Sequence, residues 1–164
     1  MSSLIIKQKF FSLGGEFWVT DENENPKYRV KGSFMKIPKS FNIFDQDGTQ
    51  RASVTHKVLS FLPKFFLEID GQEIATISKK LTFLKPRYEV EAGNVTINGN
   101  IWDMNFEIER NGLAIGRINK KWLSVRDTYR VEILNDADEL LVLGLVLAID
   151  YVKSQEAAAA SSES

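Results

Sequence analysis

The chain of 164 residues has the length of a typical single domain, and its 43% hydrophobic and 26% charged residues are an ordinary globular balance. A formal net charge of −1 excludes a strong overall attraction to nucleic acid. Because the chain has no cysteine and its N-terminus lacks a signal-peptide pattern, we expect a cytoplasmic protein without disulfides or thiol chemistry.

Short β-strands separated by tight turns are predicted from the N-terminus to about residue 134. β-branched and aromatic residues fill the predicted strands, and their number from Ile5 to Leu134 is about a dozen. Between them stand dipeptides that accept a positive φ, namely Asp47-Gly48, Asp70-Gly71, Asn98-Gly99 and Asn111-Gly112.

One strand–turn–strand unit repeats around the turn glycines Gly48, Gly71 and Gly112. Four residues after each glycine stands a small residue, and six residues after it stands a β-branched one. These positions are Ala52, Ala75 and Gly116, followed by Val54, Ile77 and Ile118. The repeat predicts a sheet that is built from equivalent hairpins.

The last apolar segment, residues 140–152 (LLVLGLVLAIDYV), is hydrophobic on every face. Such a helix is buried on all sides or lies in lipid, and crossing a membrane takes roughly 20 apolar residues. Because Asp150 interrupts the run, we expect no transmembrane span but a buried helix over 137–154, with Asp136 and Glu139 as its capping box. A helix about 10–12 Å wide needs a large barrel around it. The prediction is therefore a single domain over 1–154, in which Gly144 lets the barrel wall approach the helix, and a disordered tail over 155–164.

No motif in the sequence indicates a catalytic residue, a metal site or a cofactor, so the chain is not expected to be an enzyme. His56 is the only histidine and occupies a predicted strand end. Asp45 and Asp47 resemble the start of a calcium loop, but His56 stands where the loop's bidentate glutamate belongs. We interpret this segment as a hairpin turn, with weak cation binding as the alternative.

Charged residues alternate along the chain, with acids at one set of chain reversals and bases at the next. Since successive reversals of an up-and-down sheet lie at opposite ends, this pattern predicts an acidic rim and a basic rim. The candidate ligand-binding residues on the basic rim are Lys79, Lys80, Lys85, Arg87, Lys120 and Lys121. Apolar segments such as 81–84 and 122–125 adjoin these residues, which would suit an anionic membrane surface at about 1 kcal/mol per basic residue. The alternative is that the apolar segments close the barrel end while the lysines stay in water.

The sequence also resembles the LURP-one-related family, and its bacterial branch in particular, over about residues 4–153. The resemblance rests on segments 7–11, 21–23, 28–32, 59–63 and 83–87, on the repeated Gly…Lys-Lys hairpins and on the closing apolar helix. It implies a tubby-like fold, a closed barrel of 12 strands around a hydrophobic C-terminal helix that is shared with tubby domains and phospholipid scramblases.

The resemblance implies less about function than about fold. Tubby domains bind phosphoinositides through basic residues, but no motif maps those residues onto this chain, and the bacterial members have no assigned activity. Two hypotheses follow. The first is a non-enzymatic domain, peripheral at the membrane, whose basic rim contacts an anionic partner such as phospholipid headgroups. The second is a structural or protein-interaction domain with no lipid role.

Overall fold

A computed structural model describes residues 1–7, 16–32, 40–57, 62–80, 87–120 and 128–162. Its strands share one sheet and precede a long C-terminal helix, α1 (Glu139–Ser162). The strands are β1 (Ser2–Lys7), β2 (Glu16–Thr20), β3 (Pro26–Gly32), β4 (Ser40–Phe44), β5 (Gln50–His56), β6 (Lys64–Ile69), β7 (Gln72–Lys80), β8 (Arg87–Glu91), β9 (Val95–Asn100), β10 (Asn105–Arg110), β11 (Leu113–Asn119) and β12 (Thr128–Ile133).

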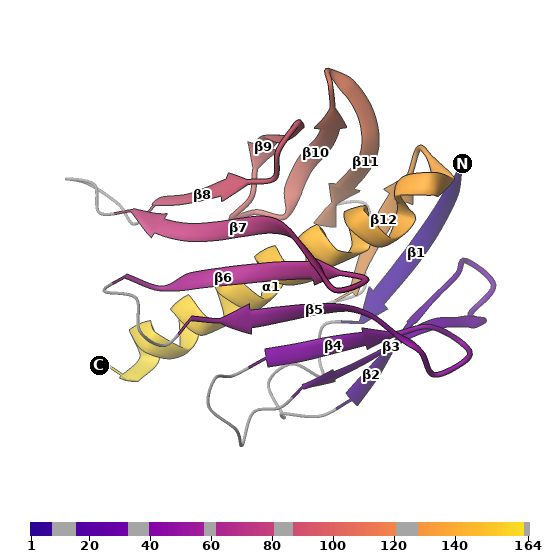
Figure 1. The fold of residues 1–164 in the computed structure, drawn as a ribbon, viewed down its shortest axis with the longest axis horizontal. Coiled ribbons are helices and arrows are strands. Elements are labelled where there is room, and N and C mark those ends of the chain that lie inside the picture. Colours follow the sequence, from indigo (N-terminus) through magenta and orange to yellow (C-terminus); the bar gives the residue numbers. More distant parts are fainter. Residues whose placement is uncertain (8–15, 33–39, 58–61, 81–86, 121–127, 163–164) are drawn as a thin grey trace.

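The strands form one 12-stranded antiparallel sheet that curls around α1 (Figure 1). Neighbours in the chain pair with each other, and β1 pairs with β12 from Ser2↔Ile133 to Lys7↔Thr128. Over the described residues β8 and β9 share only one bridge, Ala92↔Val95, so the barrel is nearly closed. We call the opening between β8 and β9 the seam. The architecture confirms the predicted fold class, a mainly β barrel around a C-terminal helix.

The repeated small residues bring the barrel wall close to α1. Ala52, Ala75 and Gly116 are all buried against the core, as are the β-branched residues two positions further on. A Cβ atom on Gly116 would lie only 2.5 Å from Cγ1 of Val142 on α1. From the helix side, a Cβ atom on Gly144 would lie 3.0 Å from Cδ1 of Leu67 on β6. The predicted close approach at Gly144 is therefore present, and Gly116 provides a second and tighter one.

Helix α1 begins later and ends later than predicted. A 3-10 turn, η3 (Asp136–Asp138), precedes it, and the side chain of Asn135 caps that turn by accepting a hydrogen bond from the amide of Ala137. The expected capping box between Asp136 and Glu139 is therefore replaced, and α1 starts at Glu139 instead of residue 137. Residues 141–152 are all buried, as expected for a central helix.

The helix continues to Ser162, beyond the end at residue 154 that the sequence predicted, and most of the segment predicted as a tail lies within it. This stretch is rich in alanine, the strongest helix former, and also contains Gln155 and Glu156. Residues 163–164 lie outside the described part. Over the described residues, no helix is both long enough and apolar enough to cross a membrane.

Three of the four predicted glycine turns are hairpin turns. Gly48, Gly71 and Gly112 follow β4, β6 and β10 with φ values of 80°, 82° and 79°. The prediction for Asn98-Gly99 is wrong, because both residues lie within β9. A Cβ atom on Gly99 would lie 2.6 Å from the carbonyl oxygen of Asn105, so glycine at this position allows the close contact between β9 and β10.

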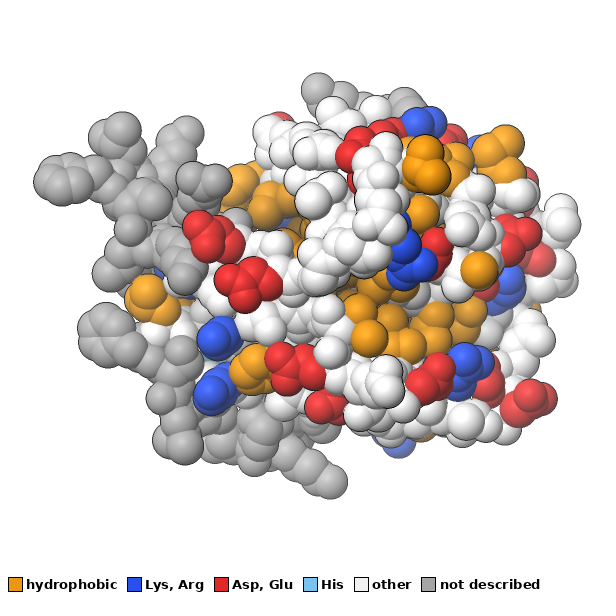
Figure 2. All heavy atoms as spheres, turned by 45° about the horizontal axis from the view of Figure 1, so that its top comes forward, with side chains coloured by type: hydrophobic (Ala, Val, Ile, Leu, Met, Phe, Trp, Pro, Cys, Tyr) orange, Lys and Arg blue, Asp and Glu red, His pale blue; other side chains and the backbone are white. Residues whose placement is uncertain are grey.

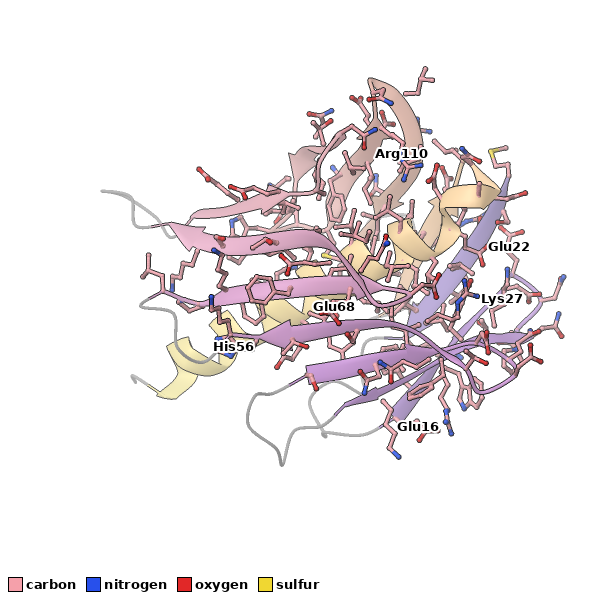
Figure 3. All side chains as sticks on the ribbon, viewed as in Figure 1. Glu16, Glu22, Lys27, His56, Glu68 and Arg110 are labelled. Carbon is pink, nitrogen blue, oxygen red and sulfur yellow. The ribbon has the colours of Figure 1, made fainter. Side chains whose placement is uncertain are left out.

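The strand directions give the barrel two different ends. One end carries the N-terminus of α1 and the hairpin turns at Gly48, Gly71 and Gly112, and we call it the turn end. The other carries the C-terminal half of α1, and we call it the basic end. In Figure 3 the labelled side chains of Glu22, Lys27 and Arg110 lie toward the turn end, whereas His56 lies toward the basic end.

Candidate functional site

Basic residues from many strands meet at the basic end. All but one stand at the end or start of a strand, or just beyond it, on the side where α1 reaches its C-terminal half, and Lys153 lies on α1 itself. They are Lys7, Lys31, Lys57, Lys64, Lys79, Lys80, Arg87, Lys120 and Lys153. The described acidic residues at this end are fewer, namely Glu16, Glu89, Asp103, Asp150 and Glu156. The strand topology therefore produces the uneven charge distribution that the alternating pattern predicts.

The structure brings three of the predicted rim residues together. In the β7–β8 ladder Lys79 is opposite Tyr88, and Lys80 is opposite Arg87. Lys120 follows β11 on the other side of the seam, and its Nζ lies 5.2 Å from the centroid of the Tyr129 ring. Lys85 and Lys121 lie outside the described residues. The described rim residues thus form two groups, one on each side of the seam.

Lys153 belongs to the second group, although it is absent from the predicted site. It lies on α1 and lines an open cleft with Trp102, Asp103 and Lys120. Burial lowers the pKa of the Lys153 ammonium, Asp150 opposes this change, and Lys120 adds to it. The sequence signal for Lys153 is weak, because the residue simply follows the last position of the hydrophobic run.

A buried polar contact lies directly behind this cleft. The Tyr129 hydroxyl donates a hydrogen bond of 3.0 Å to Oδ1 of Asp150, and both side chains are at most 1% exposed. Because Lys120 sits over the Tyr129 ring, the contact connects the basic rim with the core of the barrel. A buried carboxylate needs such partners, since its desolvation is costly. Asp150 therefore does more than interrupt the apolar run of α1.

An apolar pocket opens next to the cleft, at the basic end of the seam. It is lined by Ile77, Val90, Ile101, Trp102, Ile149, Val152 and Lys153. Its walls come from β7 and β8 on one side and from the segment after β9 on the other, and α1 forms its floor. The free space between these side chains is about 10 Å³, which is about the room for one water molecule. Figure 2 shows hydrophobic side chains in a hollow of the surface.

At the turn end, many acidic side chains have partners in the fold. Glu139 accepts hydrogen bonds from Lys27 Nζ at 2.9 Å and from the Tyr28 hydroxyl at 2.8 Å. Arg51 Nε lies 2.8 Å from Oδ1 of Asp70, and Arg110 forms an ion pair with the buried Asp138. These contacts offset much of the acidic charge at the turn end.

The two single motifs that the sequence offered have structural roles. Asp45 Oδ1 accepts hydrogen bonds from the amides of Asp47 and Thr49, each at 3.0 Å, which confirms the hairpin turn. No group of His, Asp and Glu suited to a metal ion occurs among the described residues. The His56 ring stacks on that of Phe65 with a centroid distance of 4.7 Å.

A barrel of this kind, nearly closed around a hydrophobic C-terminal helix, defines a tubby-like domain. A crystal structure of a protein from Arabidopsis thaliana shares the fold, with a TM-score of 0.59 and 14% identity over 91% of this chain and 90% of that one. The sequence profile of the LURP-one-related family matches residues 2–150, and the chain belongs to this family. It is also 30% identical to the uncharacterized protein YxjI of Bacillus subtilis (strain 168), over 93% of this chain and 94% of YxjI. This relative agrees with the predicted bacterial branch.

Proposed function

We propose that the protein is a non-enzymatic binding domain whose basic rim holds an anionic partner, and that phospholipid headgroups are the chemical class of that partner. The rim consists of Lys79, Lys80, Lys85, Arg87, Lys120 and Lys121. In this proposal the protein is cytoplasmic and acts at the membrane periphery. The observation that carries it is the meeting of basic strand ends at one end of the barrel.

The charge distribution supports this proposal. A net charge of −1 would not attract the whole molecule to an anionic surface, so the end that approaches must differ from the rest. At the turn end, Lys27 and Arg51 already have acidic partners. In the β7–β8 register Lys80 is opposite Arg87, another cation, and like charges at directly opposite strand positions are destabilising, a cost that a bound anion would reduce.

A second candidate function is protein interaction without any lipid role. It is favoured by the seam, where the facing edges of β8 and β9 share only the Ala92↔Val95 bridge over the described residues. Strand edges with unpaired backbone groups are common sites for the addition of a partner strand.

Co-sedimentation with phosphatidylglycerol-containing vesicles separates these functions. The rim variant replaces Lys79, Lys80 and Arg87 by Gln. The control variant removes equal charge from the barrel wall and the turn end, by replacing Arg29, Arg51 and Arg117 by Gln. At about 1 kcal/mol per basic residue, the rim variant should bind roughly 100-fold more weakly, whereas the control should bind like the wild type.

The lipid proposal also requires that binding decrease with added salt, because the attraction is electrostatic. It fails if wild-type protein sediments equally with neutral and anionic vesicles. An equal loss of binding in both variants would show only a response to net charge and would also refute the rim. Capture of a protein partner by the rim variant and the wild type alike would favour the second function.

A further inference from the structure

We propose that the seam is a binding site for one single-chain anionic amphiphile, with its alkyl chain against α1 and its acid group at Lys153 and Lys120. The proposal rests on the proposed function, because the basic end provides the cations for the headgroup.

Four of the seven described hydrophobic residues that pack on the core while staying partly exposed lie along the seam or on the neighbouring β7. Ile74 on β7, Val90 on β8, Ile97 on β9 and Ile101 after β9 all pack on the core without being fully buried. They continue the hydrophobic surface of α1 outward between the two strands. An elongated apolar surface of this kind suits an unbranched alkyl chain, because hydrophobic burial is not directional.

The seam is also the place where the barrel opens most easily. Elsewhere adjacent strands share ladders of backbone hydrogen bonds, but over the described residues β8 and β9 share the single bridge Ala92↔Val95 near the turn end. Toward the basic end the described residues form no further bridge between these two strands, so the strands can separate there, and a bound alkyl chain makes apolar contacts with both of them. The free space of about 10 Å³ between Val90, Ile101 and Val152 means that the chain enters by widening the seam.

The mouth of the pocket has the charge for an acid headgroup. The half-buried Lys153 lines both the apolar pocket and the cleft that it shares with Lys120. Two carboxylates lie near these lysines, but Asp150 is buried against the Tyr129 hydroxyl and Asp103 accepts a hydrogen bond from Asn100. The repulsion between the two ammonium groups is relieved by an anion at the mouth, whereas a neutral headgroup gains nothing from them.

Monomeric decanoate, octanoate and 1-decanol test the proposal on the folded full chain. In a Trp18→Phe/Trp122→Phe background Trp102 is the only tryptophan, and its emission reports binding at the pocket. Decanoate should give a saturable change and bind more than tenfold more tightly than octanoate, because each buried methylene contributes about fourfold.

Three variants divide the site into head and tail. Lys153→Met keeps the apolar stem, and should weaken decanoate about tenfold while leaving 1-decanol unchanged. Val90→Phe, at a half-buried wall position, should weaken both ligands. Lys57→Met is the matched control, because Lys57 lies at the same end of the barrel but beside Phe66 on β6, and it should bind like the wild type. Circular dichroism of each variant verifies folding before titration.

Each other outcome overturns the proposal. These outcomes are no saturable effect of decanoate, equal binding of octanoate and decanoate, and an equal loss in Lys57→Met. A seam that takes a strand of a second copy instead would give concentration-dependent dimers that decanoate does not dissociate. The vesicle assay decides the proposed function separately. Decanoate binding without vesicle binding would support the seam as a ligand site and refute the basic rim as a lipid site. Vesicle binding without decanoate binding would support the rim and refute the seam as a ligand site.

Discussion

Replacing Gly116 by Ala tests whether the barrel wall and α1 are as close as the structure shows. Gly116 is on β11, and the new methyl group would lie 2.5 Å and 2.7 Å from Cγ1 and Cγ2 of Val142. Val142 is fully buried, so its side chain has little room to move away. Gly144 offers a comparison, because the nearest atoms to its added methyl are the Leu67 methyl groups at 3.0 Å and 3.2 Å.

The expected change in the free energy of unfolding combines the cost of overpacking the core with the gain from replacing a strand glycine. Overpacking a core costs about 1–3 kcal/mol, and replacing a strand glycine by alanine returns about 0.5–1 kcal/mol. Gly116→Ala should therefore lower the free energy of unfolding by about 1–2 kcal/mol. Val142→Ala should cost about 2 kcal/mol through lost burial and a cavity. In the double variant the methyl group introduced at position 116 occupies the space that the valine side chain vacates, so the total should be about 2 kcal/mol less than the sum of the two single losses.

Urea unfolding followed by tryptophan fluorescence and by circular dichroism measures all four proteins. Coupling of about 2 kcal/mol is well above the 0.3–0.5 kcal/mol that is typical of roughly additive sites. Gly144→Ala should leave the free energy of unfolding nearly unchanged, because alanine's higher helix propensity contributes about 1 kcal/mol and offsets the cost of moving the Leu67 side chain. Additive losses for Gly116→Ala and Val142→Ala would contradict the close contact and with it the reason for a small residue at this point of the repeat.

Two further substitutions test the polar groups around α1. Tyr129→Phe removes a hydrogen-bond donor from the buried Asp150 carboxylate and should lower the free energy of unfolding, measured by urea titration, by about 2–3 kcal/mol. A loss below about 0.5 kcal/mol, the low end for a net hydrogen bond, would show that this contact does not stabilise the fold. Burial raises the pKa of Tyr151 from 10.0 to about 12. The protonated Tyr151 hydroxyl therefore contributes fully to the free energy of unfolding below pH 10, and this contribution is lost as the pH rises through about 12. The stability difference between Tyr151→Phe and wild type should therefore grow in favour of the variant above about pH 10, and a constant difference in alkaline urea titrations would contradict this.

Local patterns predicted most of the fold because they report on burial. The all-round hydrophobicity of residues 140–152 required a surrounding sheet, and the repeat around Gly48, Gly71 and Gly112 indicated its hairpins. The error at Asn98-Gly99 has a physical cause. A glycine that permits close approach of two strands looks, in sequence, like a glycine that permits a turn.

The seam and Lys153 could not be predicted in the same way. A turn at residues 92–94 between two apolar segments indicates a hairpin, and nothing local shows that β8 and β9 part after the single bridge at Ala92 and Val95. Where the two strands separate depends on how many strands are needed to enclose α1. Lys153 joins Lys120 only because the helix crosses the barrel, which is a property of the tertiary structure.

The pairing of β1 with β12 has a consequence for the order in which the chain can fold. The first strand closes on the last one, across contacts such as Leu4↔Val131, and the helix that fills the interior comes later still. During synthesis the inward-facing residues Leu4 and Ile6 lack these partners until β12 and α1 have emerged. Contacts so distant in sequence make folding slow, and a chain that stops before α1 leaves a curved sheet with an uncovered apolar face. We therefore expect chains truncated before α1 to depend on chaperones or to aggregate, since α1 follows all the strands and completes the hydrophobic core.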